Sequence, residues 1–310
     1  MYTSLFSFLF AIFLLVCYTV PIEQESRRAG FFFLDGRNSI TEVFMSEKIF
    51  TAITFFQKKK DITLYRATDG QRRYLLKSII TKDAAVKQAF YDEYETLSTL
   101  RHPSIPSYYW LEEDYLLPGK KTGALTLCME DCSRPAPEAP LSMKALCHIL
   151  AKTGDVLSYL LAHGVLYTDL NPSNLIIYRK AEQPTPSFSH ADGLLLSSHP
   201  EHNDLINIRE THTKADLSVT LVDYTYCYYF LRNPHPLYPL RFSYDVSPKL
   251  KGQQFLIQAL TYLLYDLLEA NHIEELSSPV YQLLETGRNP SDELSLDDFT
   301  AMLRHCGDPD

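Results

Sequence analysis

The chain changes from strand-forming to helix-forming patterns at a proline-rich stretch, residues 133–140. Ahead of it, residues 49–80 hold three runs rich in β-branched and aromatic side chains, with Asp69-Gly70 as a hairpin turn. Beyond it, residues 141–163 place apolar side chains three and four positions apart, which is typical of a helix. The sequence therefore predicts an α+β fold in which a small, mostly β half precedes a larger, mostly α half.

Further elements are expected in both halves. Residues 84–100 have helical spacing, and residues 105–111 and 124–129 are two short strand-like runs. Residues 255–270 are nearly apolar but only about 16 residues long, so we expect a buried core helix rather than a membrane span. A polar piece, residues 179–215, separates two apolar runs and is expected to be a surface insertion.

The N-terminal 22 residues predict a membrane anchor. Leu5 to Ile22 is free of charge, and about 18 residues at 1.5 Å each reach across a hydrocarbon core of roughly 30 Å. The first positive charges, Arg27 and Arg28, follow the run, so the rest of the chain is expected in the cytoplasm, joined by a tether over residues 23–47. A secretory signal peptide is the alternative, although no Lys or Arg precedes the run and no small-x-small cleavage site follows it.

Charge and cysteine usage exclude some classes of partner. A net charge of -9 argues against nucleic acid, which needs a basic surface. The chain has six cysteines and no Cys-x-x-Cys pair, which favours reduced thiols over a zinc site.

The stretch VLYTDLNPSNLIIY, residues 165–178, sets Asp169 five residues ahead of Asn174 between two apolar segments. Taken alone, it is also compatible with an ordinary polar turn. Together with the order of strands and helices, however, it resembles the catalytic loop His-Arg-Asp-Leu-Lys-Pro-x-Asn of the protein kinase superfamily, in particular the eukaryotic-type Ser/Thr kinases. The resemblance implies that Asp169 accepts the proton of a substrate hydroxyl and that Asn174 binds magnesium.

The resemblance covers about residues 48–305 and implies a two-lobed fold, with an N-lobe over residues 48–132 and a C-lobe over residues 133–305. It also implies further site residues and two ligands, ATP and Mg²⁺. Lys77 matches the third-strand lysine that holds the nucleotide phosphates, Glu93 matches its ion-pair partner, and Asp223 in LVDYT matches the magnesium-binding aspartate of Asp-Phe-Gly. The adenine would be bound beside Met129 by the backbone of Glu130 and Cys132.

Several positions depart from the family pattern. The turn at residues 57–62, where a glycine-rich loop is expected, has no glycine, so its backbone cannot approach phosphates as closely. Thr168 replaces an arginine that receives a regulatory phosphate. Asn171 replaces a lysine near the transferred phosphoryl group, and Thr225 replaces the glycine that gives the magnesium loop its freedom.

Two departures lie in the C-terminal half. Lys249 and Glu293 stand where the family has a glutamate and an arginine, which predicts a charge-swapped ion pair. The aspartate that usually anchors the catalytic loop has no equivalent, since Leu256 or Ile257 occupies its place.

Three hypotheses follow. The first is a membrane-anchored, degenerate kinase that binds ATP and Mg²⁺ and phosphorylates Ser or Thr hydroxyls of a protein substrate weakly. The second is a pseudokinase that acts as a scaffold or allosteric partner for another protein, with residues 179–215 as a docking surface. The third is a membrane-tethered interaction protein unrelated to kinases.

Overall fold

The structure is a computed structural model of the 310-residue chain and describes residues 50–117, 120–137, 140–179, 217–246, 250 and 252–307. The predicted anchor and tether lie outside the described residues. So do all but the first residue of the predicted insertion, and Lys249 of the predicted ion pair with Glu293.

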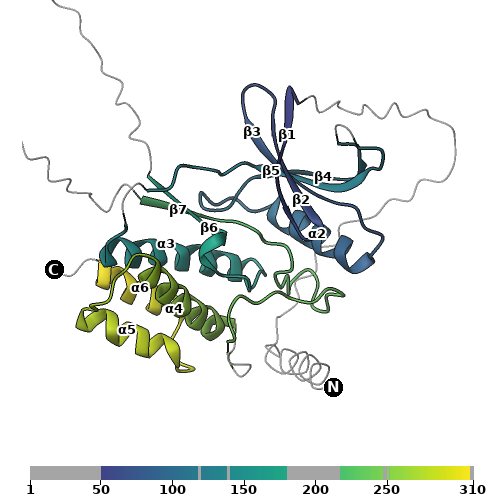
Figure 1. The fold of residues 1–310 in the computed structure, drawn as a ribbon. Coiled ribbons are helices and arrows are strands. Elements are labelled where there is room, and N and C mark those ends of the chain that lie inside the picture. The colour runs from purple at the N-terminus through teal and green to yellow at the C-terminus, as the bar shows by residue number, and fades with distance from the viewer. Residues whose placement is uncertain are drawn as a thin grey trace, which may run out of the picture.

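A five-stranded antiparallel sheet forms the first part of the described chain, in the order β1-β2-β3-β5-β4 (Figure 1). Its strands are β1 (Ala52–Lys59), β2 (Ile62–Thr68), β3 (Arg73–Ile79), β4 (Tyr108–Tyr115) and β5 (Ala124–Glu130). The mixed α+β class and the five strands are thus confirmed. β4 begins at Tyr108 rather than at residue 105, because residues 101–107 form turns and irregular chain.

One helix, α2 (Ala84–Leu97), packs against β4 and β5. Asp83 caps the N-terminus of the helix: its carboxylate accepts a hydrogen bond from the backbone N of Ala85 at 2.9 Å. α2 ends three residues earlier than the predicted residue 100, where Ser98 closes the last turn through its backbone N–H. The helix turns Phe90 and Glu93 inward, and both are fully buried.

The alternation of side chains along β3 decides what faces α2. Leu76 packs with Tyr65 and Cys128 in a small apolar cluster on one face of the sheet. Ile79 belongs instead to the main core, which also contains Phe90 of α2. Since side chains of a strand alternate between faces, Lys77 lies on the same side as Ile79 and α2.

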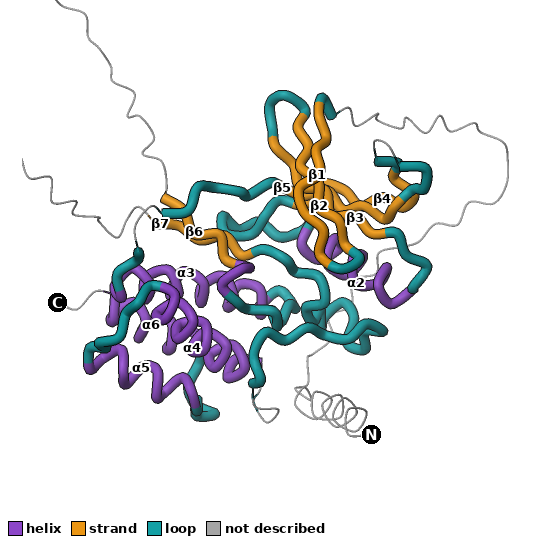
Figure 2. Tube along the Cα trace, in the orientation of Figure 1, coloured by secondary structure: helices purple, strands orange, loops and turns teal. Residues whose placement is uncertain are grey.

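The second part of the chain is mostly helical (Figure 2). Its helices are α3 (Met143–Ala162), α4 (Gly252–Ala270), α5 (Ser278–Arg288) and α6 (Leu296–Gly307). A short turn, η1 (Pro172–Asn174), leads into an antiparallel ribbon of β6 (Leu175–Arg179) and β7 (Leu217–Leu221), which lies against α3. The main core continues from α2 and β5 into these helices, so one apolar interior supports both parts.

The prediction of a buried core helix over residues 255–270 is confirmed, because most of α4 from Gln254 to Leu268 is buried. Among the described residues, α3 is long and apolar enough to cross a bilayer, but 56% of its apolar window is buried inside the protein. Such burial is typical of the core helix of a globular protein.

Candidate functional site

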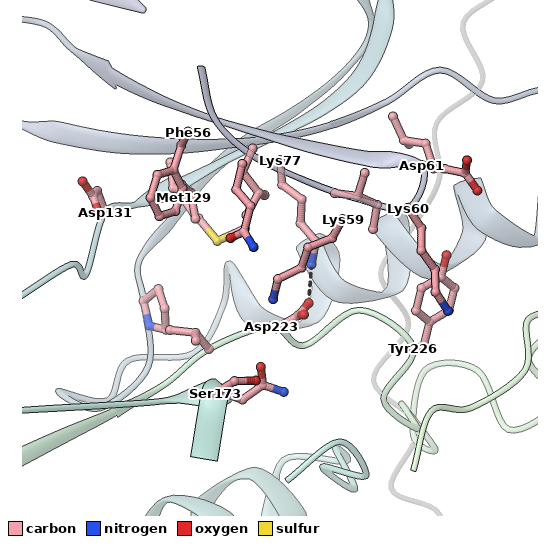
Figure 3. Close-up of a pocket in the computed structure, with 18 of the residues that line it drawn as sticks. Phe56, Lys59, Lys60, Asp61, Lys77, Met129, Asp131, Ser173, Asp223 and Tyr226 are labelled. Atoms are coloured by element: carbon pink, nitrogen blue, oxygen red, sulfur yellow. Dashed lines mark hydrogen bonds and ion pairs between the residues drawn. The ribbon is translucent and has the colours of Figure 1, made fainter. Parts of the chain in front are cut away.

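A cavity of about 820 Å³ lies between the sheet on one side and η1, β6 and the loop that follows β7 on the other. This volume is in the range of sites for small molecules. Figure 3 shows Phe56 and Met129 together in one part of the cavity, while Lys77, Lys59 and Asp223 lie together in another. The cavity therefore has an apolar end and a charged end.

Lys77 is the centre of the charged end. Its side chain is only 6% exposed, and its Nζ lies 3.3 Å from Oε2 of Glu93 and 2.9 Å from Oδ1 of Asp223. Burial alone would lower the pKa of Lys77, but the charges of Asp223 and Glu93 outweigh burial and raise it above its ordinary value. Lys77 is therefore a cation held between two carboxylates, and the predicted pairing of Lys77 with Glu93 is present.

The hydroxyl of Thr225 bridges the two members of this ion pair. Its hydroxyl accepts a hydrogen bond from Lys77 Nζ and donates one to Oε2 of Glu93, and the residue is fully buried. The two left-handed residues of this loop are Asp223, with φ 61°, and Tyr226, with φ 68°, and position 225 is not one of them. The expectation that Thr225 restricts the loop is therefore not supported by the backbone, because position 225 makes no use of a glycine's freedom.

Asp169 accepts hydrogen bonds on both carboxylate oxygens. Oδ1 accepts from the hydroxyl of Ser243 at 2.6 Å, and Oδ2 accepts from Nδ2 of Asn174 at 3.3 Å. Asn171 has a structural role here: its side-chain oxygen accepts from the backbone N of Ser173 and its Nδ2 donates to the backbone oxygen of Asp169. The carboxylate is thus fixed in orientation by its own loop and by Ser243.

The loops that carry Asn174 and Asp223 are joined by backbone hydrogen bonding. The backbone N of Val222 donates to the backbone oxygen of Asn174 at 2.9 Å, and the hydroxyl of Tyr167 donates to the backbone oxygen of Val222 at 2.6 Å. Tyr167 and Tyr224 also pack edge to face, with ring centroids 5.1 Å apart. These contacts bring the predicted metal ligands Asn174 and Asp223 to the wall of the same cavity.

A carboxylate and a carboxamide oxygen are donors that Mg²⁺ prefers. Burial would raise the pKa of Asp223, but Lys77 outweighs burial and holds it below its ordinary value, so Asp223 is ionised at neutral pH. Within the described ranges, no group of three or more His, Cys, Asp or Glu side chains could hold a metal ion by itself. The pair fits Mg²⁺ that takes its remaining ligands from water and phosphate, which is how this ion is usually bound.

The apolar end is built from β5 and the chain that follows it. Met129, Glu130 and Cys132 all line the cavity, as do Leu75 and Ile176. Burial raises the pKa of the Cys132 thiol to about 12, so this thiol is neutral at physiological pH. Met129, Leu75 and Ile176 thus give this end apolar walls, and Glu130 and Asp131 line the cavity beside them.

The glycine-free turn covers the cavity from the β1–β2 side. Phe56, Gln57, Lys59, Lys60 and Asp61 all contribute to its wall. Lys60 has φ 51°, a left-handed conformation that is uncommon outside glycine, asparagine and aspartate. The turn places the side chain of Lys59 near Asp223 at the charged end, while Lys60 lies beside Tyr226 (Figure 3).

Asp92, next to Glu93 on α2, holds the irregular chain at residues 232–238. Its Oδ2 accepts hydrogen bonds from Nδ2 of Asn233 at 2.8 Å and from the hydroxyl of Tyr238 at 2.9 Å, and Oδ1 lies 3.6 Å from Nε of Arg232. The helix that positions Glu93 is thereby tied to the segment that follows Asp223.

Thr168, which stands where the resemblance to kinases predicts a phosphate-binding arginine, is buried, and its hydroxyl has no hydrogen-bond partner among the described residues.

All eight predicted site residues therefore lie in or beside one cavity: Lys77, Met129, Glu130, Cys132, Asn174 and Asp223 line it, while Glu93 and Asp169 contact residues that do. Sequence reasoning missed Arg241 and Ser243, which reach Asp169 from an irregular segment that carries no motif.

The chain was also compared with known proteins. No protein-family model matches it, and no curated protein matches it.

Proposed function

We propose that this protein is a divergent, kinase-like phosphotransferase with two lobes, which binds ATP and Mg²⁺ and transfers the terminal phosphoryl group slowly to a Ser or Thr hydroxyl of a protein. The observation that carries the proposal is the position of Lys77, whose Nζ lies within 3.3 Å of carboxylate oxygens of both Glu93 and Asp223, residues of three separate segments. Lys77 and Asp223 line the cavity, and Glu93 lies buried behind Lys77. The charged end suits the phosphates, and the apolar end beside Met129 suits the adenine.

In the proposed reaction, Lys77 would bind the phosphates next to the adenosine, and Asp223 and Asn174 would hold Mg²⁺, which would neutralise phosphate charge. Asp169 lies in the loop before η1, beside Asn174, and would accept the proton of the attacking hydroxyl. The hydroxyl oxygen forms a bond to the terminal phosphorus as the bond from that phosphorus to the bridging oxygen breaks, and ADP leaves. The predicted N-terminal anchor would place this reaction at the cytoplasmic face of a membrane.

The test is thermal unfolding of the full chain, kept in mild detergent because of its apolar N-terminus, with ATP and Mg²⁺ together and each alone. Saturation at a hundred times the dissociation constant stabilises a protein by roughly 2.7 kcal/mol, so we expect a shift of several degrees with both ligands. Asp223→Asn should lose most of the shift, because it removes the charged metal ligand. No shift with ATP and Mg²⁺ in the wild type would contradict the proposal.

A scaffold without phosphoryl transfer is the second candidate, favoured by the absence of glycine from the turn over the cavity. Incubation with ATP labelled on its terminal phosphate separates the two. A protein that binds ATP and labels itself or an added protein, with the label lost in Asp169→Asn, acts as an enzyme. A protein that binds ATP with no labelled product acts as the scaffold.

A further inference from the structure

Arg241 places a positive charge beside both acidic residues of the site. Its Nη1 lies 3.6 Å from Oδ2 of Asp169 and 3.9 Å from Oδ2 of Asp223, and its side chain lines the cavity. It stands 18 positions after Asp223 in the sequence, in chain that has neither helix nor strand. No motif in the sequence marks this residue.

The backbone around Arg241 is fixed to the loops of the site. Its backbone N donates to the backbone oxygen of Tyr226 at 3.1 Å, and its guanidinium lies 5.1 Å from the centre of the Tyr226 ring. Two residues further on, Ser243 donates to Asp169 through its hydroxyl and to the backbone oxygen of Thr168 through its backbone N. The arginine is therefore positioned by its neighbours before any ligand arrives.

The contacts of Arg241 with the two carboxylates are longer than the 2.7–2.9 Å that is usual for a charge-assisted hydrogen bond. The Arg241 side chain remains 41% exposed, and its guanidinium has five N–H donors in a planar fork, an arrangement that suits the oxygens of a phosphate. Lys59 lines the same cavity from the β1 side, and its charge also helps to hold the pKa of Asp223 down.

The position that the kinase family fills with a lysine has no charge in this chain. Asn171 stands there and uses its amide to hold the turn before β6 and to donate to Ser243 at 2.9 Å. Arg241 reaches the neighbourhood of Asp169 from a different segment, so a cation is present where position 171 supplies none.

We propose that Arg241 binds the terminal phosphate of the nucleotide and supplies the positive charge that is missing at position 171. This inference rests on the proposed function, since it requires a nucleoside triphosphate in the cavity. It predicts a specific signature: Arg241 distinguishes ATP from ADP, because ADP lacks the phosphate that Arg241 would contact.

The experiment is calorimetric titration of the full chain in detergent with ATP and, separately, ADP, both with Mg²⁺. Arg241→Gln should weaken ATP binding on the order of ten-fold, the usual effect of a charge-assisted contact, and change ADP binding less than about two-fold. Arg241→Lys should lie between, because it keeps the charge without the fork. Arg304→Gln is the matched control, since Arg304 pairs with Asp155 on exposed surface away from the cavity lining.

The outcomes separate the two proposals. If wild type binds both nucleotides and Arg241→Gln weakens ATP and ADP equally, leaves both unchanged or strengthens both, this inference is wrong and the proposed function stands. If wild type binds neither nucleotide, the proposed function fails and the role of Arg241 fails with it. Thermal unfolding of each variant without nucleotide shows whether the chain is still folded.

Discussion

Lys77→Met is expected to destabilise the protein by about 3 kcal/mol or more, because removal of one partner from a buried ion pair leaves the other charge unpaired. Glu93 is fully buried, and without Lys77 its charge would keep, among the residues that the structure describes, the hydroxyls of Tyr108 and Thr225 as partners. For a domain of this size the loss corresponds to a fall in Tm of about 6 °C or more. Denaturant unfolding monitored by circular dichroism measures it.

A second substitution separates a charge effect from a packing effect. Lys77→Met combined with Glu93→Gln should recover a substantial part of the loss, because the unpaired carboxylate is removed. Lys87→Met is the matched control, since Lys87 pairs with Glu113 where their side chains are 32% and 44% exposed, and it should cost at most about 1 kcal/mol. Equal losses for Lys77→Met and Lys87→Met would mean that Lys77 is not the buried charge described above.

Thr225→Val is expected to cost about 2 kcal/mol, because it removes the hydroxyl between Lys77 and Glu93 while it preserves the shape of the side chain. Thr225→Ser keeps the hydroxyl and should cost less than Thr225→Val. Thr225→Gly, which introduces the glycine of the kinase pattern that this sequence resembles, should be the most damaging of the three, since it removes both the hydroxyl and the packed methyl group. Unfolding free energies of the three variants test this order.

The control for Thr225 is Thr153→Val in α3. Thr153 is also buried, but its hydroxyl donates only to the backbone oxygen of Ile149 within the same helix. Loss of such a bond should change stability by no more than about 0.5 kcal/mol. A Thr225→Gly variant more stable than the wild type would show instead that the loop needs a glycine at this position.

Local patterns were sufficient for much of the fold. Runs of β-branched and aromatic residues and a hairpin turn placed the first three strands, and helical spacing placed α2, α3 and α4 with errors of a few residues at their ends. The pairing of Lys77 with Glu93 was predicted from the resemblance to kinases, and the ion pair is present. Local patterns contributed the strand and the helix on which the two residues lie.

The other residues of the site are brought together by residues 226–246, a segment without helix or strand. Arg241 and Ser243 reach Asp169 because residues 226–246 fold back onto the loop, through contacts such as the paired backbone hydrogen bonds of Leu166 and Tyr228. Thr225 was interpreted as the loss of a glycine from the family pattern. In the structure its hydroxyl forms hydrogen bonds with two residues more than 100 positions away in the sequence. Contacts of this kind leave no periodic signal in the sequence.

The most direct test of the central claim, that the charged end of the cavity holds nucleotide phosphates, is affinity labelling with an acyl-phosphate derivative of ATP. A lysine amine near the bound phosphates attacks the acyl carbon and forms a stable amide as ATP is released, and mass spectrometry then identifies the labelled residue. We expect Mg²⁺-dependent label on Lys77, lost when excess ATP competes. Label on exposed lysines such as Lys87 alone, unchanged by excess ATP, would contradict a nucleotide site in this cavity.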